Sequence, residues 1–339
     1  MREPAFWWRN AGLAAGLLAP LAAIYGAIAA RRMAGPSARA ALPVLCVGNF
    51  TLGGAGKTPT VMALATMLQQ AGERPCCLSR GYGGSLAGPQ LVDAHADRAA
   101  QVGDEALLLA RVAPTIVARD RVAGAAAAAA AGASVVIMDD GLQNASLAKD
   151  FTLAVVDGRR GIGNACVFPA GPLRAPLAAQ VARSDALLVV GEAAGGRDVV
   201  GAGEARGIVG AARGLPVFHG RLVPDPAAVM ALKARKVLAF AGIGDPEKFF
   251  ATAVAAGIAI AQRRAFGDHH RYTAEQAAEL IMQAEHDGLA LLTTEKDRAR
   301  MAGEPLLAAL ATRAHVLPVT LVVEEVDELR RLVLAKVRR

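Results

Sequence analysis

Hydrophobic residues along the chain gather in short runs that alternate with longer segments of helical periodicity. Before residue 200, the apolar runs that suit buried strands are 43–47, 75–79, 114–118, 134–138, 151–156 and 186–190. The alanine tract 123–133 between two of these runs suits a packing helix, because alanine has the highest helix propensity. Buried strands that alternate with helices form parallel sheets with helices on their faces. The pattern therefore predicts an α/β fold with a mostly parallel sheet.

A second, smaller α/β unit is predicted after residue 225. Its strand candidates are 236–241, 258–264, 289–293 and 315–319, and its helix candidates lie near 246–256, 274–286 and 325–337. Residues 191–214 are rich in Gly, Ala and Arg and show no clear period. We expect an apolar N-terminal helix (1–35), a main nucleotide-binding domain (36–200), a linker or crossover (201–225) and a second α/β domain (226–339).

The N-terminus carries an uncharged apolar run, 11–30, that is closed by Arg31 and Arg32. Its length meets the ~20 residues that a membrane-spanning helix needs. The run is rich in alanine and glycine, however, and Trp7 and Trp8 beside it suit the headgroup level of a bilayer. We expect a helix that lies in the membrane interface; a spanning helix and an ordinary helix of the soluble fold are the alternatives. A cleaved signal peptide is disfavoured by the nucleotide-binding loop that soon follows.

The balance of charges narrows the class of partner. Lys and Arg number 37 against 30 Asp and Glu, and the net charge of +7 suits nucleotides, phosphorylated substrates or an anionic membrane face. Aromatic residues are few and are not interleaved with basic ones, so we expect no nucleic acid partner. The cysteines show no C-x-x-C spacing, which predicts buried thiols in a reducing cytoplasm. They are Cys46, Cys76, Cys77 and Cys166.

The segment 51–58 has the pattern of a phosphate-binding loop between a strand and a helix. Its residues are Thr51, Leu52, Gly53, Gly54, Ala55, Gly56, Lys57 and Thr58. Glycines let backbone N–H groups converge on phosphate oxygens at a helix N-terminus. Lys57 can reach the β- and γ-phosphates, and the Thr58 hydroxyl can hold Mg²⁺. Thr51 replaces the first glycine of the usual pattern, which Gly53 and Gly54 partly offset. We expect ATP and Mg²⁺ to bind here.

Two carboxylates follow the buried run 134–138. At the carboxyl end of a parallel strand, Asp139 and Asp140 would face the same crevice as the phosphate loop. We expect one of them to hold Mg²⁺ directly or through water, with the choice between them left open. Because Asp-Asp-Gly is also good turn chemistry, a solvated turn is the alternative.

Three further loops follow predicted strands. Arg80 and Tyr82 lie in a glycine-rich loop after the second run, Arg174 ends the rigid loop 169–174, and 293–297 ends a strand of the second unit. Each loop could be a plain connection. Their shared position at the carboxyl ends of strands predicts a common site.

Two other segments carry reactive side chains without a defined role of their own. Asp104 precedes an apolar helix, where by itself it would be a helix N-cap. The loop 266–272 holds Asp268, His269 and His270, which could ligate a metal. The sequence lacks the additional carboxylate motifs of a metal-dependent phosphoesterase, so a surface loop is the plainer alternative.

Taken together, the ordered motifs resemble the tetraacyldisaccharide 4'-kinases, the lipid A 4'-kinases of Gram-negative bacteria. The resemblance covers nearly the whole chain and rests on Gly48-Asn49 with Thr51–Thr58, Ser79–Gly84, Gly103-Asp104-Glu105, Asp139–Gln143, Pro169–Arg174, Phe266–His269 and Thr294–Asp297. It implies transfer of the ATP γ-phosphate to the 4'-hydroxyl of an acylated glucosamine disaccharide 1-phosphate, which completes lipid IVA. It also implies that the N-terminal helix docks on the cytoplasmic face of the inner membrane. We expect no obligatory protein partner.

The resemblance further implies roles for single residues. Asp104 matches an aspartate that accepts the hydroxyl proton, and His269 matches the histidine paired with it, whereas His270 has no implied role. Asp139 and Asp140 match a pair associated with Mg²⁺. Candidates for contacting the substrate's 1-phosphate or the nucleotide phosphates are Arg80, Tyr82 and Arg174.

Two other classes of protein fit part of the sequence. A membrane-associated deviant-Walker ATPase would share the G-G-x-G-K-T loop and the membrane helix. Such proteins usually carry a lysine just before the two glycines, where this chain has Leu52. A cytosolic small-molecule kinase or ligase would leave the apolar N-terminus unexplained. The lipid kinase is therefore the expected function.

Overall fold

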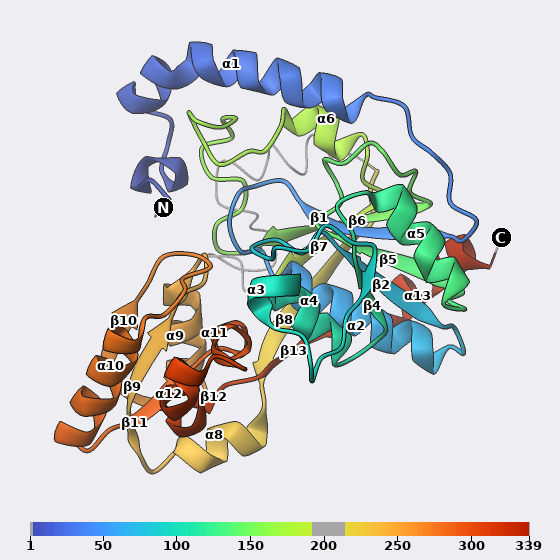
Figure 1. Ribbon diagram of the computed structural model, residues 1–339. Helices are drawn as coiled ribbons and strands as arrows, with labels where there is room; N and C mark the ends of the chain where they lie inside the picture. Colours follow the sequence, from blue (N-terminus) through green and yellow to red (C-terminus); the bar gives the residue numbers. More distant parts are fainter. Residues whose placement is uncertain (1–2, 192–213, 339) are drawn as a thin grey trace.

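The computed structural model describes residues 3–191 and 214–338 and shows two lobes and a long N-terminal helix (Figure 1). The larger lobe is built on a nine-stranded sheet and the smaller lobe on a four-stranded sheet. Helix α1 (Leu13–Met33) lies along the outside of the larger lobe, next to α6 (Leu177–Val181). The predicted α/β fold with a second, smaller unit and an apolar N-terminal helix is confirmed.

The strands of the large sheet run in the order β13-β8-β7-β6-β1-β5-β2-β4-β3. They are β1 (Val44–Asn49), β2 (Pro75–Ser79), β3 (Gln90–Leu91), β4 (Thr115–Val117), β5 (Val135–Asp139), β6 (Phe151–Asp157), β7 (Ala186–Val190), β8 (Val217–Pro224) and β13 (Val319–Val323). The pairs from β4 to β8 are parallel, whereas β3 and β13 are antiparallel edge strands. Because β1 lies between β5 and β6, its carboxyl end opens beside the ends of both neighbours.

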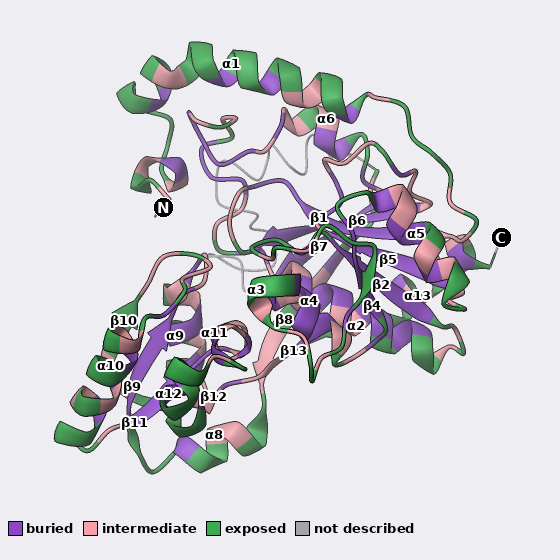
Figure 2. Ribbon diagram, viewed as in Figure 1, coloured by how far each residue is buried: buried purple, intermediate pink, exposed green. Residues whose placement is uncertain are grey.

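Helices cover both faces of this sheet (Figure 2). Its central strands are wholly buried, whereas β3, β8 and β13 are partly or fully exposed. Besides α1 and α6, they are α2 (Lys57–Gln70), α3 (Ala99–Val102), α4 (Asp104–Ala110), α5 (Arg121–Ala130) and α13 (Val326–Val337). On one face α2 and α13 contribute Leu64 and Leu329 to the core. On the other face the alanine-rich α5 lies so close to β2 that a Cβ at Gly124 would be 2.5 Å from Leu78. Small side chains therefore permit this close packing.

The smaller lobe is a parallel sheet of order β10-β9-β11-β12, also covered on both faces. Its elements are α8 (Pro226–Leu232), β9 (Lys236–Ala241), α9 (Pro246–Ala255), β10 (Ala259–Ala265), α10 (Ala274–His286), β11 (Ala290–Thr293), α11 (Glu295–Met301), η2 (Pro305–Leu307), α12 (Ala308–Arg313) and β12 (His315–Val316). One core lies under α9 and a second under α10 and α12.

The chain crosses between the lobes twice, so the lobes do not end where the sequence predicts. The predicted linker 201–225 contains β8, which pairs in parallel with β7 and belongs to the large sheet. Residues 192–213, which include the end of the predicted main domain and the start of the predicted linker, lie outside the described residues. The prediction of one strand over 315–319 is wrong: β12 ends at Val316, and β13 pairs with β8. Since α13 also packs on the large-sheet core, the predicted second domain 226–339 returns to the larger lobe after residue 317.

Helix α1 packs against the larger lobe by a narrow face of small residues. Ala15 and Ala22 are buried beside Ala170, and a Cβ at Gly26 would be 3.5 Å from Pro176. The outward side is apolar and exposed (Figure 2). It carries Leu13, Leu17, Leu21, Ile24 and Ile28. By length and composition this helix is able to cross a membrane. The preceding turn η1 (Ala5–Trp8) buries Trp7.

Candidate active site

The predicted phosphate-binding segment 51–58 forms a loop between β1 and α2. Gly53 and Gly56 have φ values of 92° and 93°, which residues with a side chain rarely adopt. Neighbouring groups fix the loop. The Asn49 side chain donates a 2.7 Å hydrogen bond to the carbonyl of Thr51, and the Leu52 amide donates a 2.8 Å bond to the carbonyl of Pro172. The backbone is thus held in a tight turn at a helix N-terminus, as anion binding requires.

Lys57, the first residue of α2, lies between two acceptors of the larger lobe. Its Nζ donates a 3.0 Å hydrogen bond to Oδ1 of Asn49 and is 3.7 Å from Oδ1 of Asp140. Burial lowers the pKa of Lys57, although the Asp140 carboxylate acts in the opposite direction. Lys57 also lines the cavity described below, so an anion in that cavity can reach its charge.

Asp139 and Asp140 are consecutive but have different surroundings. Both oxygens of Asp140 accept hydrogen bonds of 3.0 Å from Nη1 of Arg174. Burial alone would raise the pKa of Asp140, but Lys57 and Arg174 hold it well below its usual range. Asp139 is 3% exposed, and its Oδ1 has no hydrogen-bond partner among the described residues. Burial and the negative charges of Glu105 and Asp140 raise the pKa of Asp139 to about 7.

A buried carboxylate oxygen without a partner is what a bound cation would satisfy. Asp139 and Thr58 both line the cavity. Within residues 3–191 and 214–338, no group of three or more His, Cys, Asp and Glu side chains could hold a metal. This donor set fits Mg²⁺, which is commonly held by one or two carboxylates together with waters and substrate phosphates.

Asp104 and His269 come together from the two lobes. Asp104 begins α4, is 3% exposed, and has its Oδ1 3.4 Å from Nδ1 of His269. Burial would raise the pKa of Asp104, but His269, Arg300 and Lys296 outweigh burial and hold it well below its usual range. Burial would likewise lower the pKa of His269, but the contact with Asp104 prevails and raises it. His269 has a φ of 52°, a costly conformation that tends to occur at functional sites.

The three candidate substrate-binding residues differ in how far their side chains are already hydrogen-bonded. Tyr82 and Arg80 line the cavity, and the Tyr82 ring lies 4.7 Å from the His269 ring. Arg174 also lines the cavity, but its Nε and Nη1 are engaged: besides Asp140, it donates from Nε to the carbonyl of Thr51 at 2.9 Å. Arg174 therefore ties Asp140 to the phosphate loop.

The smaller lobe contacts the larger lobe directly at this site. Nζ of Lys296 donates a 2.7 Å hydrogen bond to Oε1 of Glu105 on α4. The loop after β9 places Gly244 so close to the phosphate loop that a Cβ would be 3.1 Å from the amide nitrogen of Gly54. Both contacts hold the second lobe over the loop.

A cluster of charges joins the lobes beside these contacts. Asp245 is 4% exposed, accepts a hydrogen bond from the Lys248 amide at the start of α9, and forms ion pairs with Arg159 and Arg160. Nζ of Lys248 donates in turn to Oδ2 of Asp157 at 2.6 Å. The end of β6 is therefore bound to the start of α9 by paired charges.

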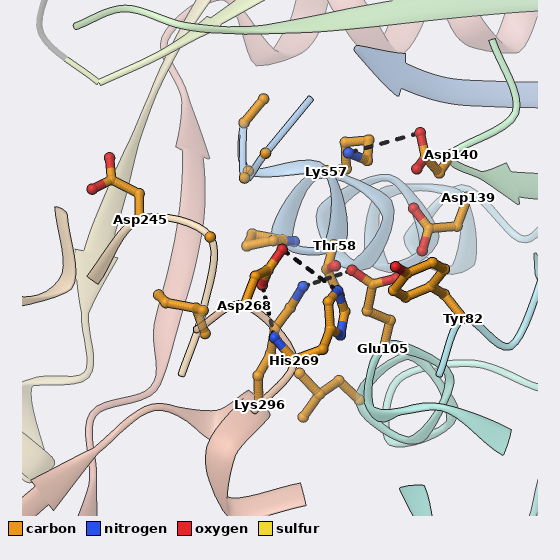
Figure 3. Close-up of a pocket in the computed structure, with 18 of the residues that line it drawn as sticks. Lys57, Thr58, Tyr82, Glu105, Asp139, Asp140, Asp245, Asp268, His269 and Lys296 are labelled. Carbon is orange, nitrogen blue, oxygen red and sulfur yellow. Dashed lines mark hydrogen bonds and ion pairs between the residues drawn. The ribbon is translucent and has the colours of Figure 1, made fainter. Parts of the chain in front are cut away.

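These groups surround one cavity of about 660 Å³ between the lobes (Figure 3). Its lining includes Leu52–Thr58, Arg80, Tyr82, Asp139, Asp140, Arg174 and His269. Thr51 and Asp104 are buried beside it, and His270 stacks on Phe266. Sequence patterns did not reveal Asp245, Arg160 or Arg300. Their ion-pair partners in the other lobe lie far away in the chain, so no characteristic spacing of residues marks them.

A phosphate loop after the central strand, a carboxylate at the end of the neighbouring strand, and a second lobe in contact with both define a P-loop nucleotide-binding enzyme of the α/β class. The comparison with protein families narrows this class. The chain belongs to the tetraacyldisaccharide-1-P 4'-kinase family, whose family model matches residues 14–338. The family predicted from the motifs, and with it a kinase, is confirmed.

Relatives agree with this assignment over their whole length. A tetraacyldisaccharide 4'-kinase of Rhodopseudomonas palustris (strain BisB5) is 54% identical over 100% of this chain and 98% of its own. The enzyme of that name from Methylobacterium sp. (strain 4-46) is 59% identical over 94% of each chain. A crystal structure of LpxK from Aquifex aeolicus in complex with ATP superposes with a TM-score of 0.73, at 26% identity, over 95% of this chain and 99% of that one.

Proposed function

We propose that this kinase transfers the γ-phosphate of ATP to the 4'-hydroxyl of an acylated glucosamine disaccharide 1-phosphate, a step of lipid A biosynthesis. The observation that carries the proposal is that residues 52–58 and His269 line one cavity, and that His269 pairs with the buried Asp104. Phosphoryl transfer depends on alignment and charge neutralisation rather than on covalent catalysis. At this cavity Lys57 can bind phosphate, Asp139 can bind a cation, and the pair Asp104–His269 can accept the proton of a hydroxyl.

Asp139 and Thr58 are the protein groups that we assign to Mg²⁺. When bound, the ion would neutralise charge on the transferred phosphoryl group. The free Oδ1 of Asp139 supports this choice, because both oxygens of Asp140 already accept from Arg174. We assign Asp140 to orient Lys57 and Arg174.

Lys57 and the loop amides stabilise the phosphates. The Lys57 ammonium is held between Asn49 and Asp140, so its charge is oriented before a ligand arrives. The left-handed Gly53 and Gly56 allow the amides between them to converge.

Asp104 orients the acceptor hydroxyl and receives its proton, with His269 sharing that proton. In a loose transition state the hydroxyl proton is lost late, so a carboxylate of low pKa can still orient the nucleophile. Because His269 belongs to the smaller lobe, the pair is complete only while the lobes are together.

We assign Arg80 and Tyr82 to contacts with the phosphates or the acceptor sugar, because both line the cavity beside His269. Arg174 holds the loop and Asp140 through Nε and Nη1, and it also lines the cavity, so we assign its remaining Nη2 to contact with a phosphate.

The outer face of α1 is the membrane-docking surface in this proposal, on the cytoplasmic side of the inner membrane. Leu13 and Leu17 are 89% and 83% exposed, and Leu21, Ile24 and Ile28 continue the same face. Burial of such a face in the acyl boundary is favourable by about 25 cal/mol per Å². A peripheral helix is released from membranes by carbonate extraction, whereas a spanning helix is retained.

A radiolabel assay tests the function. The full-length enzyme is incubated with γ-labelled ATP, Mg²⁺ and a tetraacylated disaccharide 1-phosphate, and products are separated by thin-layer chromatography. Label on the lipid, lost with Lys57→Ala, supports the proposal. Label on free phosphate alone indicates an ATPase switch, and label on a soluble acceptor indicates a small-molecule kinase.

A further inference from the structure

Arg300 on α11 connects the smaller lobe to Asp104 of the larger lobe. Its side chain is 7% exposed. Nε donates a 2.7 Å hydrogen bond to Oδ2 of Asp104, and Nη2 lies 2.7 Å from the same oxygen as an ion-pair contact. Nη1 donates to the carbonyl of Gly242 at 2.6 Å and to Oδ1 of Asp297 at 3.0 Å, both in the smaller lobe. One buried guanidinium therefore bridges the lobes.

We propose that Arg300 is a positioning residue of the phosphoryl transfer, which fixes the rotation of the Asp104 carboxylate from the opposite lobe. This inference rests on the proposed role of Asp104 and adds a residue that neither the sequence motifs nor that role require. Arg300 touches neither substrate in this scheme. It acts through Asp104.

The two carboxylate oxygens of Asp104 have different partners. Arg300 occupies Oδ2 of Asp104, whereas Oδ1 accepts a 3.0 Å hydrogen bond from the Glu105 amide and faces His269 at 3.4 Å. Without Arg300 only the Glu105 amide and His269 restrain the carboxylate, both at Oδ1, so its rotation about the last bond is less tightly fixed. Misplacement of a reacting group by about 1 Å can cost up to about 10²-fold in rate.

The position of Arg300 is itself fixed by a buried network. Asp297 is fully buried and accepts hydrogen bonds from the Gly242 amide at 3.0 Å, the Tyr272 hydroxyl at 2.8 Å and the Thr294 hydroxyl at 2.6 Å. Gly242 begins the same loop that places Gly244 against the phosphate loop. Arg300 thus connects Asp104 to the loop of the smaller lobe that contacts the phosphate loop.

Together with His269 and Lys296, Arg300 also keeps Asp104 ionised. Titratable or charged groups that face Asp104, or face its partners, come from α4, α11 and the loop after β10: Glu105, Lys296, Asp297, Arg300, Asp268, His269 and Tyr272. Removal of Arg300 leaves a buried carboxylate with weaker positive surroundings, so the pKa of Asp104 rises. The acid limb of the kcat profile should then move to higher pH.

The test compares Arg300→Gln and Arg300→Lys with Arg298→Gln, a control on the same helix whose side chain makes no hydrogen bond or ion pair with any described residue. For Arg300→Gln we expect kcat to fall by up to about 10²-fold with the ATP KM little changed, and the acid limb to shift upward. Arg300→Lys should restore part of kcat and of the pH profile. Normal kcat with an unshifted acid limb in Arg300→Gln overturns the proposal.

A double-mutant cycle with Asp104→Asn separates this proposal from the role of Asp104, and thermal melts check folding. If Asp104→Asn alone keeps full activity, the assignment of Asp104 fails. If Asp104→Asn is inactive and Arg300→Gln is normal, only the Arg300 inference fails. If Arg300→Gln does not fold, Arg300→Lys is the deciding variant. The positioning role is contradicted if Arg300→Lys has the wild-type kcat and pH profile and if its effect simply adds to that of Asp104→Asn.

Discussion

Gly244 of the smaller lobe lies against the amide nitrogen of Gly54 in the phosphate loop, so that a Cβ at position 244 would be 3.1 Å from this nitrogen. The amide nitrogen of Gly54 belongs to the backbone, so it cannot move aside by a rotation as a side-chain atom can. Closure of the cavity therefore depends on the absence of a side chain at this point of the second lobe. Gly244 also lies near Asp268, whose carboxylate would be 3.4 Å from the added carbon.

We accordingly expect Gly244→Ala to raise the ATP KM and lower kcat, because the added methyl group separates the loop from the second lobe. The matched control is Gly267→Ala in the same lobe, where an added Cβ meets nothing within 4 Å. Steady-state kinetics with both variants checks this. Equal kinetics of the two variants would contradict the contact.

Removal of either member of the base pair should affect turnover rather than nucleotide binding. We expect Asp104→Ala and His269→Ala each to lower kcat by about 10²–10⁴-fold, the usual contribution of a positioned base, with little change in the ATP KM. His286→Ala, an exposed histidine at the end of α10, serves as the control. Near-normal kcat in either variant would remove the pair from the mechanism.

The same pair predicts a pH dependence. The pKa of His269 in the folded protein lies above its ordinary value of 6.5, because Asp104 favours the charged ring. The stability that this pair contributes is therefore complete below about pH 6.5 and is lost as the pH rises through the raised pKa. NMR titration of His269 should show the raised value in the wild type and a lower one in Asp104→Asn. An unchanged titration in that variant would mean that the two side chains do not interact.

Asp139 should be the carboxylate on which Mg²⁺ depends. Asp139→Asn removes an uncompensated buried charge, so without ligand we expect it to be at least as stable as the wild type. Mg-ATP at about 100 times its Kd stabilises a binding protein by about 2.7 kcal/mol, and Asp139→Asn should lose most of this shift. Asp140→Asn, which frees Arg174 and Lys57, is the comparison. Equal Mg²⁺ dependence of Asp139→Asn and wild type in thermal melts would reassign the ligand.

The elements that local sequence patterns describe were predicted well. The loop 51–58 follows a fully buried strand and Asp139 is the last residue of another, so the strands themselves place both at the carboxyl edge of the sheet. Strands β8 and β13 left weaker signals, because β8 is interrupted by Gly220 and Arg221 and both strands lie toward the edge of the sheet.

Contacts between the lobes could not be predicted from the chain. Arg300 and Asp104 are 196 positions apart, and neither residue has a spacing that indicates the other. In the sequence Asp104 is indistinguishable from a helix N-cap, and its burial beside three cations appears only when the second lobe is in place.

Paired charges around Asp245 join the two lobes. Asp245 and Asp225 are closely matched: each is followed by proline, and each caps a helix through its side chain. Asp245 additionally pairs with Arg159 and Arg160 of the larger lobe, whereas Asp225 forms no ion pair with any residue in the described ranges. Asparagine caps a helix as well as aspartate does, so each Asp→Asn substitution keeps the cap and removes only the charge.

Asp245→Asn should therefore separate the lobes and Asp225→Asn should not. We expect Asp245→Asn to lower kcat and raise the KM for both substrates, and to increase the radius of gyration measured by small-angle scattering. Its cost in stability should be smaller than the about 3–5 kcal/mol of a fully buried pair, because Arg159 is 46% exposed and Arg160 23%. High salt should weaken the wild type in the same direction and leave Asp245→Asn less affected. If both variants behave alike, Asp245 acts only as a cap, and the lobes are held by the other contacts: Lys248 with Asp157, Lys296, Arg300 and the contact at Gly244.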